Sequence, residues 1–340
     1  MKISFLVTFY NQEKYVYDNL ESISKIQIPC DYEIIVGDDG STDNTIEEVE
    51  KWRGVFGDHL FIIRSNRDDG ITDKVQRASN LRKRLLGHSV GDFFCICDGD
   101  DYYCDSSFIN EAIALLNKYD SLSLIMHGMN MKYPHKAEYS APEMQEGRVN
   151  SREYIRWHYS PAESCVYRRL YDELFQDRVN RALYYDDNDI VITHLSYGDA
   201  WFVNKPVINY RQHDDSIWNS MNRAQQGVVN VIGAENECYL SPNYKNDIIF
   251  RYRRDILYSY FRKNNPETQI GRGYIRLFDY NNMPVSDLCT VLFDISHASD
   301  EQVKKVEELI INLRIMDFPT YKNVRENVDK ERTCEEEELV

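Results

Sequence analysis

The sequence predicts an α/β fold with a Rossmann-like, mainly parallel sheet covered by helices on both faces. Within residues 1–130, short apolar runs of strand length alternate with longer segments whose apolar residues recur at helical spacing. Strands separated by helical segments of about 10–15 residues are typical of parallel sheets built from strand–helix–strand units. The chain of 340 residues is 42% hydrophobic, which is enough for a packed core.

Five apolar runs predict the strands of this sheet, and four amphipathic segments predict its helices. The strands are expected at 3–9, 32–36, 60–63, 93–97 and 122–126. The helices are expected between them, at 12–26, 43–56, 72–86 and 106–118. Asp43 or Ser41 is the expected N-cap of the second helix, because a short polar side chain can accept a hydrogen bond from a free backbone N–H group.

The pattern loosens after about residue 130. We expect a polar loop, a strand, a helix and an extended segment broken by a proline, at 133–148, 164–168, 187–197 and 201–212 respectively. Residues 1–219 are therefore expected to form one domain, and residues 220–330 a mostly helical C-terminal region. The four glutamates at 335–338 predict a disordered acidic tail over 331–340.

Composition excludes several classes of protein. The net charge of −16 argues against broad electrostatic binding to nucleic acid, which needs basic surfaces. The eight cysteines contain no CxxC pair, so neither a zinc site nor a disulfide framework is expected. The first apolar run is too short for a signal peptide, and no run of about 18 apolar residues would span a membrane. We expect a cytoplasmic protein with reduced thiols.

Acidic clusters follow two of the predicted strands. Asp38 and Asp39 precede Gly40 after the second strand, and the sequence DGDD at 98–101 follows the fourth strand. Ligands of open α/β sheets bind beyond the carboxyl ends of the strands, so both clusters should lie at the binding edge. The chain has neither a GxGxxG nor a GxxxxGK[ST] loop for phosphate. An acidic edge can hold phosphate through a bridging cation, and Mn²⁺ or Mg²⁺ suits carboxylate oxygens. A turn that uses Asp and Gly only for local geometry is the alternative.

Five short motifs resemble those of family 2 glycosyltransferases, enzymes with the GT-A fold. No single motif is specific, but their order and spacing over about 215 residues are, and the last third of the chain carries no such motif. The motifs are VTFYN at 7–11, VGDDGSTD at 36–43, CDGDD at 97–101, YDDND at 185–189 and YRQHDDS at 210–216.

The resemblance implies a site for a nucleotide-sugar donor. Thr8, Tyr10 and Asp39 would hold the nucleotide. Asp39 would accept a hydrogen bond from an N–H group of the base, and Tyr10 would contact the ring of the base. Asp98 would meet the ribose or the metal, and Asp100 would ligate the metal. The remaining roles fall to basic residues: Arg77 or Lys74 near the diphosphate or base, Arg211 at the diphosphate, and His213 at the metal or a phosphate.

Members of this family often carry adjacent arginine and asparagine residues before the fourth strand. That pair is absent here, because Ser79 precedes Asn80. Arg77 and Lys74 can therefore also be read as the solvated face of a helix. In the same way, His213 can be read as a histidine of a polar surface loop.

The resemblance also implies an inverting reaction in which one displacement joins the sugar to an acceptor hydroxyl. A carboxylate must accept the hydroxyl proton, and Asp187 matches the position of this base, with Asp186 as the rival. An N-cap for the following helix is the structural alternative for either aspartate. The donor would be a UDP-sugar, and the acceptor a glycan or a lipid-linked saccharide in the synthesis of polysaccharide or surface glycan.

Two other functions remain as alternatives. A metal-dependent phosphohydrolase also uses a DxD motif, but that motif normally opens the first strand of its fold, whereas Asp98 follows the fourth. A non-catalytic nucleotide-sugar-binding module would leave Asp187 without a role. The segment 252–263 mixes basic and aromatic residues. It can be read as a helix that packs on the first domain, as a peripheral contact with the inner face of a membrane, or as a homodimer contact.

Overall fold

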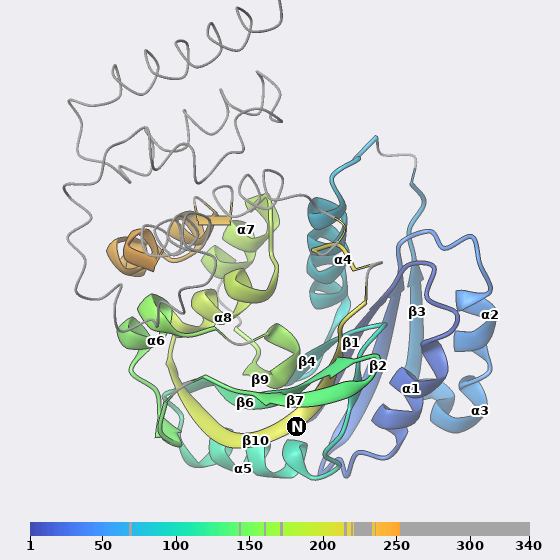
Figure 1. The fold of residues 1–340 in the computed structure, drawn as a ribbon, viewed down its shortest axis with the longest axis horizontal. Coiled ribbons are helices and arrows are strands. Elements are labelled where there is room, and N and C mark those ends of the chain that lie inside the picture. The colour runs from blue at the N-terminus through green and yellow to red at the C-terminus, as the bar shows by residue number, and fades with distance from the viewer. Residues whose placement is uncertain are drawn as a thin grey trace, which may run out of the picture. The chain divides into compact units, whose positions relative to one another are not determined.

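The computed structural model describes residues 1–67, 70–142, 144–159, 161–170, 173–213, 216–218, 220, 233–234 and 236–251. Within this part, ten strands form one sheet in the order β3-β2-β1-β4-β9-β6-β10-β5, with β7 and β8 paired to β6 and β10 (Figure 1). The chain divides into two compact units, of which the first comprises Met1–Ile217 and Tyr239–Asn243 and carries the sheet. The second comprises Trp218–Cys238 and Tyr244–Val340.

The N-terminal half of the sheet is parallel. It consists of β1 (Lys2–Phe9), β2 (Asp31–Asp38), β3 (Leu60–Arg64) and β4 (Phe93–Asp98). In the register of these pairs, Phe9 lies beside Asp38 and Thr8 lies beside Asp98. The carboxyl ends of these strands therefore meet at one edge of the sheet, as the sequence predicts.

The second half is mixed, and its two longest strands, β6 (Leu122–Tyr133) and β10 (Asp199–Arg211), are parallel. Pro206 lies at a register shift between them, a position that suits a residue without a backbone N–H donor. The short strands pair antiparallel and are β5 (Tyr102–Tyr103), β7 (Lys136–Ser140), β8 (Gly147–Arg148) and β9 (Cys165–Arg168).

Helices cover both faces of the sheet, because successive residues of its strands point to opposite faces and are apolar on each. Phe5 and Val7 belong to a core with residues of α1 (Val16–Ser24), α2 (Thr45–Glu50) and α5 (Phe108–Lys118). On the other face, a Cβ atom at Gly37 would lie 2.9 Å from the side chains of Leu81 and Leu85, so glycine lets α4 (Lys74–His88) approach β2 closely. The remaining helices are α3 (Arg53–Phe56), α6 (Ser151–Trp157), α7 (Glu173–Arg181) and α8 (Asp187–Leu195).

Four sequence-based expectations for secondary structure were wrong. The helix expected at 43–56 is two short helices, and the helix expected from residue 12 begins at Val16. The N-cap of α2 is Asn44, while the Asp43 carboxylate accepts from Thr45 N at 3.0 Å. The polar segment 133–148 is not a loop, because β7 and β8 lie within it. Their hydrogen bonds to β6 and β10 form across the sheet, so polar, exposed residues such as those of β7 still form strands.

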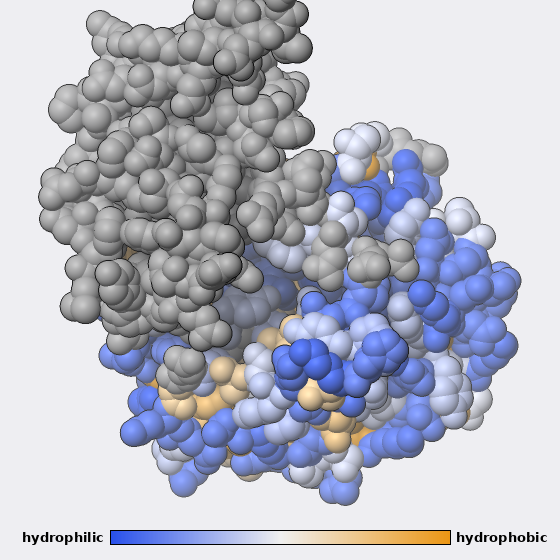
Figure 2. All heavy atoms as spheres, viewed as in Figure 1, coloured by the Kyte–Doolittle hydropathy of each residue, from blue (hydrophilic) through white to orange (hydrophobic). Residues whose placement is uncertain are grey.

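Most of the expected C-terminal region and all of the expected tail lie outside the described residues, as does the basic and aromatic segment 252–263. No helix in the described ranges is long and apolar enough to cross a membrane. All six cysteines in those ranges are free thiols. The described surface in Figure 2 is mostly hydrophilic, with hydrophobic residues in small patches.

Candidate active site

The acidic turn at 98–101 is held in place by residues of β1 and α1. Thr8 of β1 donates its hydroxyl to Asp98 Oδ1 at 2.7 Å, and Asn19 of α1 donates to the carbonyls of Asp98 and Asp101 at 3.0 and 2.9 Å. A Cβ atom at Gly99 would lie 2.1 Å from the Phe9 ring. Glycine is therefore required here by close packing, which holds the turn rigidly against β1.

Arg82 links this turn to the start of α8. Its guanidinium donates to Asp98 Oδ2 at 2.6 Å and to the carboxylate of Asp186, and the side chain is only 6% exposed. Burial alone would raise the pKa of Asp98, but Arg82 and Thr8 hold that pKa below its usual range. Arg82 was not predicted from the sequence, because its carboxylate partners lie 16 and 104 residues away along the chain.

Two further carboxyls are buried at this point, that of Asp101 within the turn and that of Glu163 beside it. Burial and the charge of Asp100 raise the pKa of Asp101 well above its usual range, and burial and Asp98 do the same to Glu163. Glu163 accepts from the backbone N–H of Asp98 at 3.3 Å. Each of these carboxyls therefore holds its proton more tightly than an ordinary carboxyl, which reduces the repulsion that a fully ionised cluster would suffer. Glu163 is a second residue that sequence reasoning missed, because no motif contains it.

Asp186 and Asp187 have different surroundings. Asp186 caps α8 in a capping box with Asp189 and binds Arg82. Asp187 instead accepts a hydrogen bond from the Tyr159 hydroxyl at 2.8 Å, and its own side chain is part-exposed. Burial and the neighbouring charge of Asp186 raise the pKa of Asp187 to about 7. The N-cap role therefore belongs to Asp186, and Asp187 has the proton affinity that a general base needs near neutral pH.

Asp100 and His213 meet at the far side of the turn. His213 Nε2 lies 2.8 Å from Asp100 Oδ2, and both side chains are largely buried. Arg211 donates to Asp101 Oδ1 and to the Asp100 carbonyl, each at 2.7 Å, and also pairs with Asp18. Arg211 thereby fixes the backbone of the acidic turn.

The donor set at this point is one carboxylate oxygen and one imidazole nitrogen, both of which ligate Mn²⁺. Across the ranges the structure describes, no three His, Cys, Asp or Glu side chains are grouped as a metal site. The two residues fit a divalent cation that takes its remaining ligands from phosphate and water.

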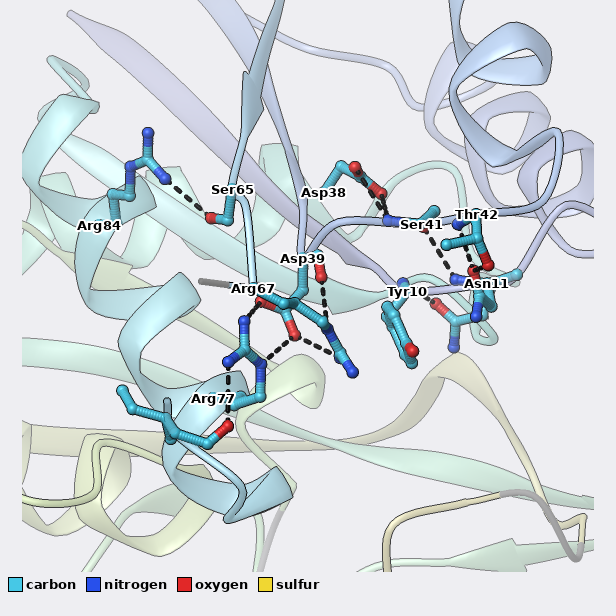
Figure 3. Close-up of polar contacts among 12 residues, drawn as sticks. Tyr10, Asn11, Asp38, Asp39, Ser41, Thr42, Ser65, Arg67, Arg77 and Arg84 are labelled. Carbon is cyan, nitrogen blue, oxygen red and sulfur yellow. Dashed lines mark hydrogen bonds and ion pairs between the residues drawn. The ribbon is translucent and has the colours of Figure 1, made fainter. Parts of the chain in front are cut away.

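Asp39 follows β2, which β1 separates from β4 in the sheet, and it is paired with two arginines. Arg77 donates to both carboxylate oxygens, each at 2.9 Å, and its side chain is 6% exposed. Arg67 donates to Asp39 Oδ2 at 2.6 Å and lies over the ring of Tyr10 (Figure 3). The reading of Arg77 as a solvated helix face was therefore wrong, because an ion pair that spans β2 and α4 buries it.

The site thus gathers Thr8, Tyr10, Asp39, Asp98, Asp100 and Asp187 around the carboxyl ends of β1, β2 and β4 and the start of α8. Residues 4–175 match the family model for glycosyl transferase family 2, about half of the chain. The chain belongs to glycosyl transferase family 2. The expected family was therefore correct.

Among curated relatives of this family 2 chain is the poly(ribitol-phosphate) β-N-acetylglucosaminyltransferase TarS of Staphylococcus aureus. It is 29% identical over 155 residues, which is 45% of this chain and 26% of that protein. The match therefore spans about a quarter of the length of that relative. An uncharacterized protein of Mycobacterium tuberculosis is 23% identical over 222 residues, 64% of this chain and 61% of that protein.

Solved structures confirm the fold of this family 2 chain. The crystal structure of S. aureus TarS residues 1–349 in complex with UDP-GlcNAc superposes with a TM-score of 0.60. It is 19% identical and covers 99% of this chain and 91% of that chain. The UDP complex of the same protein gives a TM-score of 0.58. The GT-A fold expected from the motifs is therefore correct.

Proposed function

We propose that this chain transfers a sugar from a nucleoside-diphosphate sugar, most simply a UDP-sugar, to a hydroxyl of a glycan or lipid-linked saccharide, with inversion at the anomeric carbon. The observation that carries the proposal is the position of Asp187. This carboxyl has a pKa of about 7, and Arg82 and Asp186 connect its helix to the acidic turn. A basic carboxylate beside a candidate diphosphate site is what a single displacement requires.

Each end of the donor has a candidate binding group. Tyr10 offers a 40% exposed ring for the base, and Asp39 offers a carboxylate for a base N–H. Asp98 is held by Thr8 and Arg82 at the next strand end, where it can receive the ribose hydroxyls. Asp100 and His213 would hold Mn²⁺ or Mg²⁺. When bound, that cation would stabilise the negative charge of the departing diphosphate.

The reaction forms a bond between the acceptor oxygen and the anomeric carbon and breaks the bond from that carbon to the diphosphate. The acceptor proton passes to Asp187, and the nucleoside diphosphate leaves with the electron pair. Tyr159 donates to Asp187 Oδ2 and leaves Oδ1 to face the incoming hydroxyl, apart from a long contact of 3.4 Å to Ala162 N. Tyr159 thus orients the base.

The pH dependence follows from the pKa of Asp187. The base must be ionised to accept a proton, so kcat/KM should rise with pH, about tenfold per unit below pH 7, and level off above it. Burial and the charges of Asp186 and Asp98 raise this pKa, while Arg82 and the hydrogen bond from Tyr159 lower it. The check is a pH–rate profile from pH 5 to 9. A rate that is independent of pH below 7 would exclude Asp187 as the base.

Removal of the cation tests Asp100 and His213. Treatment with EDTA should abolish transfer, and Mn²⁺ or Mg²⁺ should restore it. Asp100→Ala should lower the rate about 10²-fold or more, because a ligand to the ion that stabilises developing charge is lost. Calorimetric titration with Mn²⁺ in the presence of UDP measures binding directly. Wild-type Mn²⁺ affinity in Asp100→Ala would refute its role as a ligand.

The two alternative functions predict different products. A phosphohydrolase would release phosphate from simple phosphoesters, and a binding module would bind a nucleotide sugar without turnover. Our proposal predicts that UDP is released from a UDP-sugar and that the released sugar appears on an acceptor with inverted configuration. A screen of nucleotide sugars with Mn²⁺, read by nucleotide release and by NMR of the product anomer, tests it.

A further inference from the structure

Arg67 occupies the place that the proposed base would need. Its guanidinium carbon lies 3.4 Å from the centroid of the Tyr10 ring, which is contact distance. A base stacked between the two would require roughly twice that separation. Figure 3 shows the Arg67 head group lying between Asp39 and the Tyr10 ring.

The guanidinium also makes the contacts that a base would make. It is planar and stacks on Tyr10, and its N–H edge donates to Asp39 Oδ2 at 2.6 Å. A pyrimidine base has the same two features, a flat face for stacking and an N–H donor at its edge. The Nε–H of Arg67 adds a hydrogen bond to the Asp39 carbonyl at 2.8 Å.

The two arginines of Asp39 differ in how firmly they are held. Arg77 makes two hydrogen bonds to the carboxylate and donates to the Ile71 carbonyl, with its side chain 6% exposed. The side chain of Arg67 is 37% exposed and comes from the segment after β3. If Arg67 moves away, Arg77 still neutralises Asp39, so the cost of its departure is small.

We infer that Arg67 is an exchangeable occupant of the base subsite, which closes Tyr10 and Asp39 in the donor-free protein and must leave before the base can bind. The inference rests on the proposed function, because it assigns the base to Tyr10 and Asp39. Arg67 thereby lowers the affinity for the nucleotide and aids release of the nucleoside diphosphate after transfer. Gly40 has a φ of +76°, and a Cβ atom there would lie 3.3 Å from Arg67 Cγ, so glycine leaves room for the arginine.

The test compares Arg67→Ala with wild type by calorimetric titration with UDP in the presence of Mn²⁺. Loss of the stacking contact and of a half-exposed ion pair should tighten UDP binding about threefold to tenfold. Inorganic pyrophosphate reports the phosphate subsite alone, and its affinity should be unchanged. Arg84→Ala is the matched control, because Arg84 donates to Ser65 Oγ nearby and does not touch Asp39 (Figure 3).

Equal or weaker UDP binding by Arg67→Ala, with pyrophosphate binding unchanged, would overturn the inference and leave the proposed function intact. Absence of UDP binding in both proteins would overturn the inference and the proposed uridine donor together. A second readout is the NMR signal of the Arg67 Nε–H group. It should lose its hydrogen-bonded shift when UDP binds to wild type, and an unchanged signal in the complex would contradict the exchange.

Discussion

Replacing Asp187 with asparagine is expected to lower the rate of sugar transfer by about 10²- to 10⁴-fold, the usual contribution of a general base. Asparagine keeps the size of the side chain and an oxygen that can accept from Tyr159, so the local structure should persist. It cannot accept the proton of an acceptor hydroxyl. Affinity for UDP should therefore stay within about twofold of wild type, because the lost function acts only on the reacting atoms.

Two matched substitutions complete this experiment. Asp177→Asn makes the same chemical change on the surface of α7, where Asp177 pairs with Arg181, and should leave the rate unchanged. Asp186→Asn separates the two candidate bases. Asparagine can still cap α8, so the substitution should reduce stability only through the weakened contact with Arg82, while some transfer remains. Normal transfer by Asp187→Asn with none by Asp186→Asn would reverse the assignment.

Arg82→Met is expected to destabilise the protein by about 3 kcal/mol, the lower end of the cost of breaking a buried ion pair, because Asp98 and Asp186 remain partly exposed to water. Arg82 forms ion pairs with Asp98 and Asp186. Asp187 and Glu163 lie close enough to raise the pKa of its guanidinium as well. Methionine fills much of the same volume but leaves these carboxylates repelling each other. Denaturant unfolding at pH 7 measures the change in the free energy of unfolding.

The control for this prediction is Arg84→Met, two residues further along α4. Arg84 is exposed and donates to Ser65, so its loss should change the free energy of unfolding by less than about 0.5 kcal/mol. The destabilisation of Arg82→Met should also shrink at low pH, because protonation of the carboxylates removes their repulsion. Equal stability of the Arg82 and Arg84 variants at pH 7 would contradict the central place given to Arg82.

The parallel half of the sheet could be predicted because its information is local. Each strand from β1 to β4 is an apolar run, and the spacing of the intervening helices admits few other folds. The acidic edge followed from the same reasoning, since the ends of parallel strands meet, Asp98 is the last residue of β4 and Asp39 directly follows β2. Strands β7 and β8 could not be predicted, because their polar residues pair through tertiary contacts with β6 and β10.

Contacts between residues that are distant in the sequence could not be predicted either. Arg82 contacts a residue 104 positions away, and Glu163 contacts one 65 positions away, so no motif could join them. The electrostatic state of the site depends on these partners. Burial is the first cause of the raised pKa of Asp187, and burial is a property of the folded chain.

The most direct test of the account is a crystal structure of the chain with UDP-GlcNAc and Mn²⁺, the sugar nucleotide that the related TarS structure contains. We predict that the base stacks on Tyr10 and donates to Asp39, that Arg67 is displaced, that the cation contacts Asp100 and His213, and that the anomeric carbon faces Asp187. A nucleotide bound away from the ends of β1, β2 and β4, or an anomeric carbon turned away from Asp187, would contradict it.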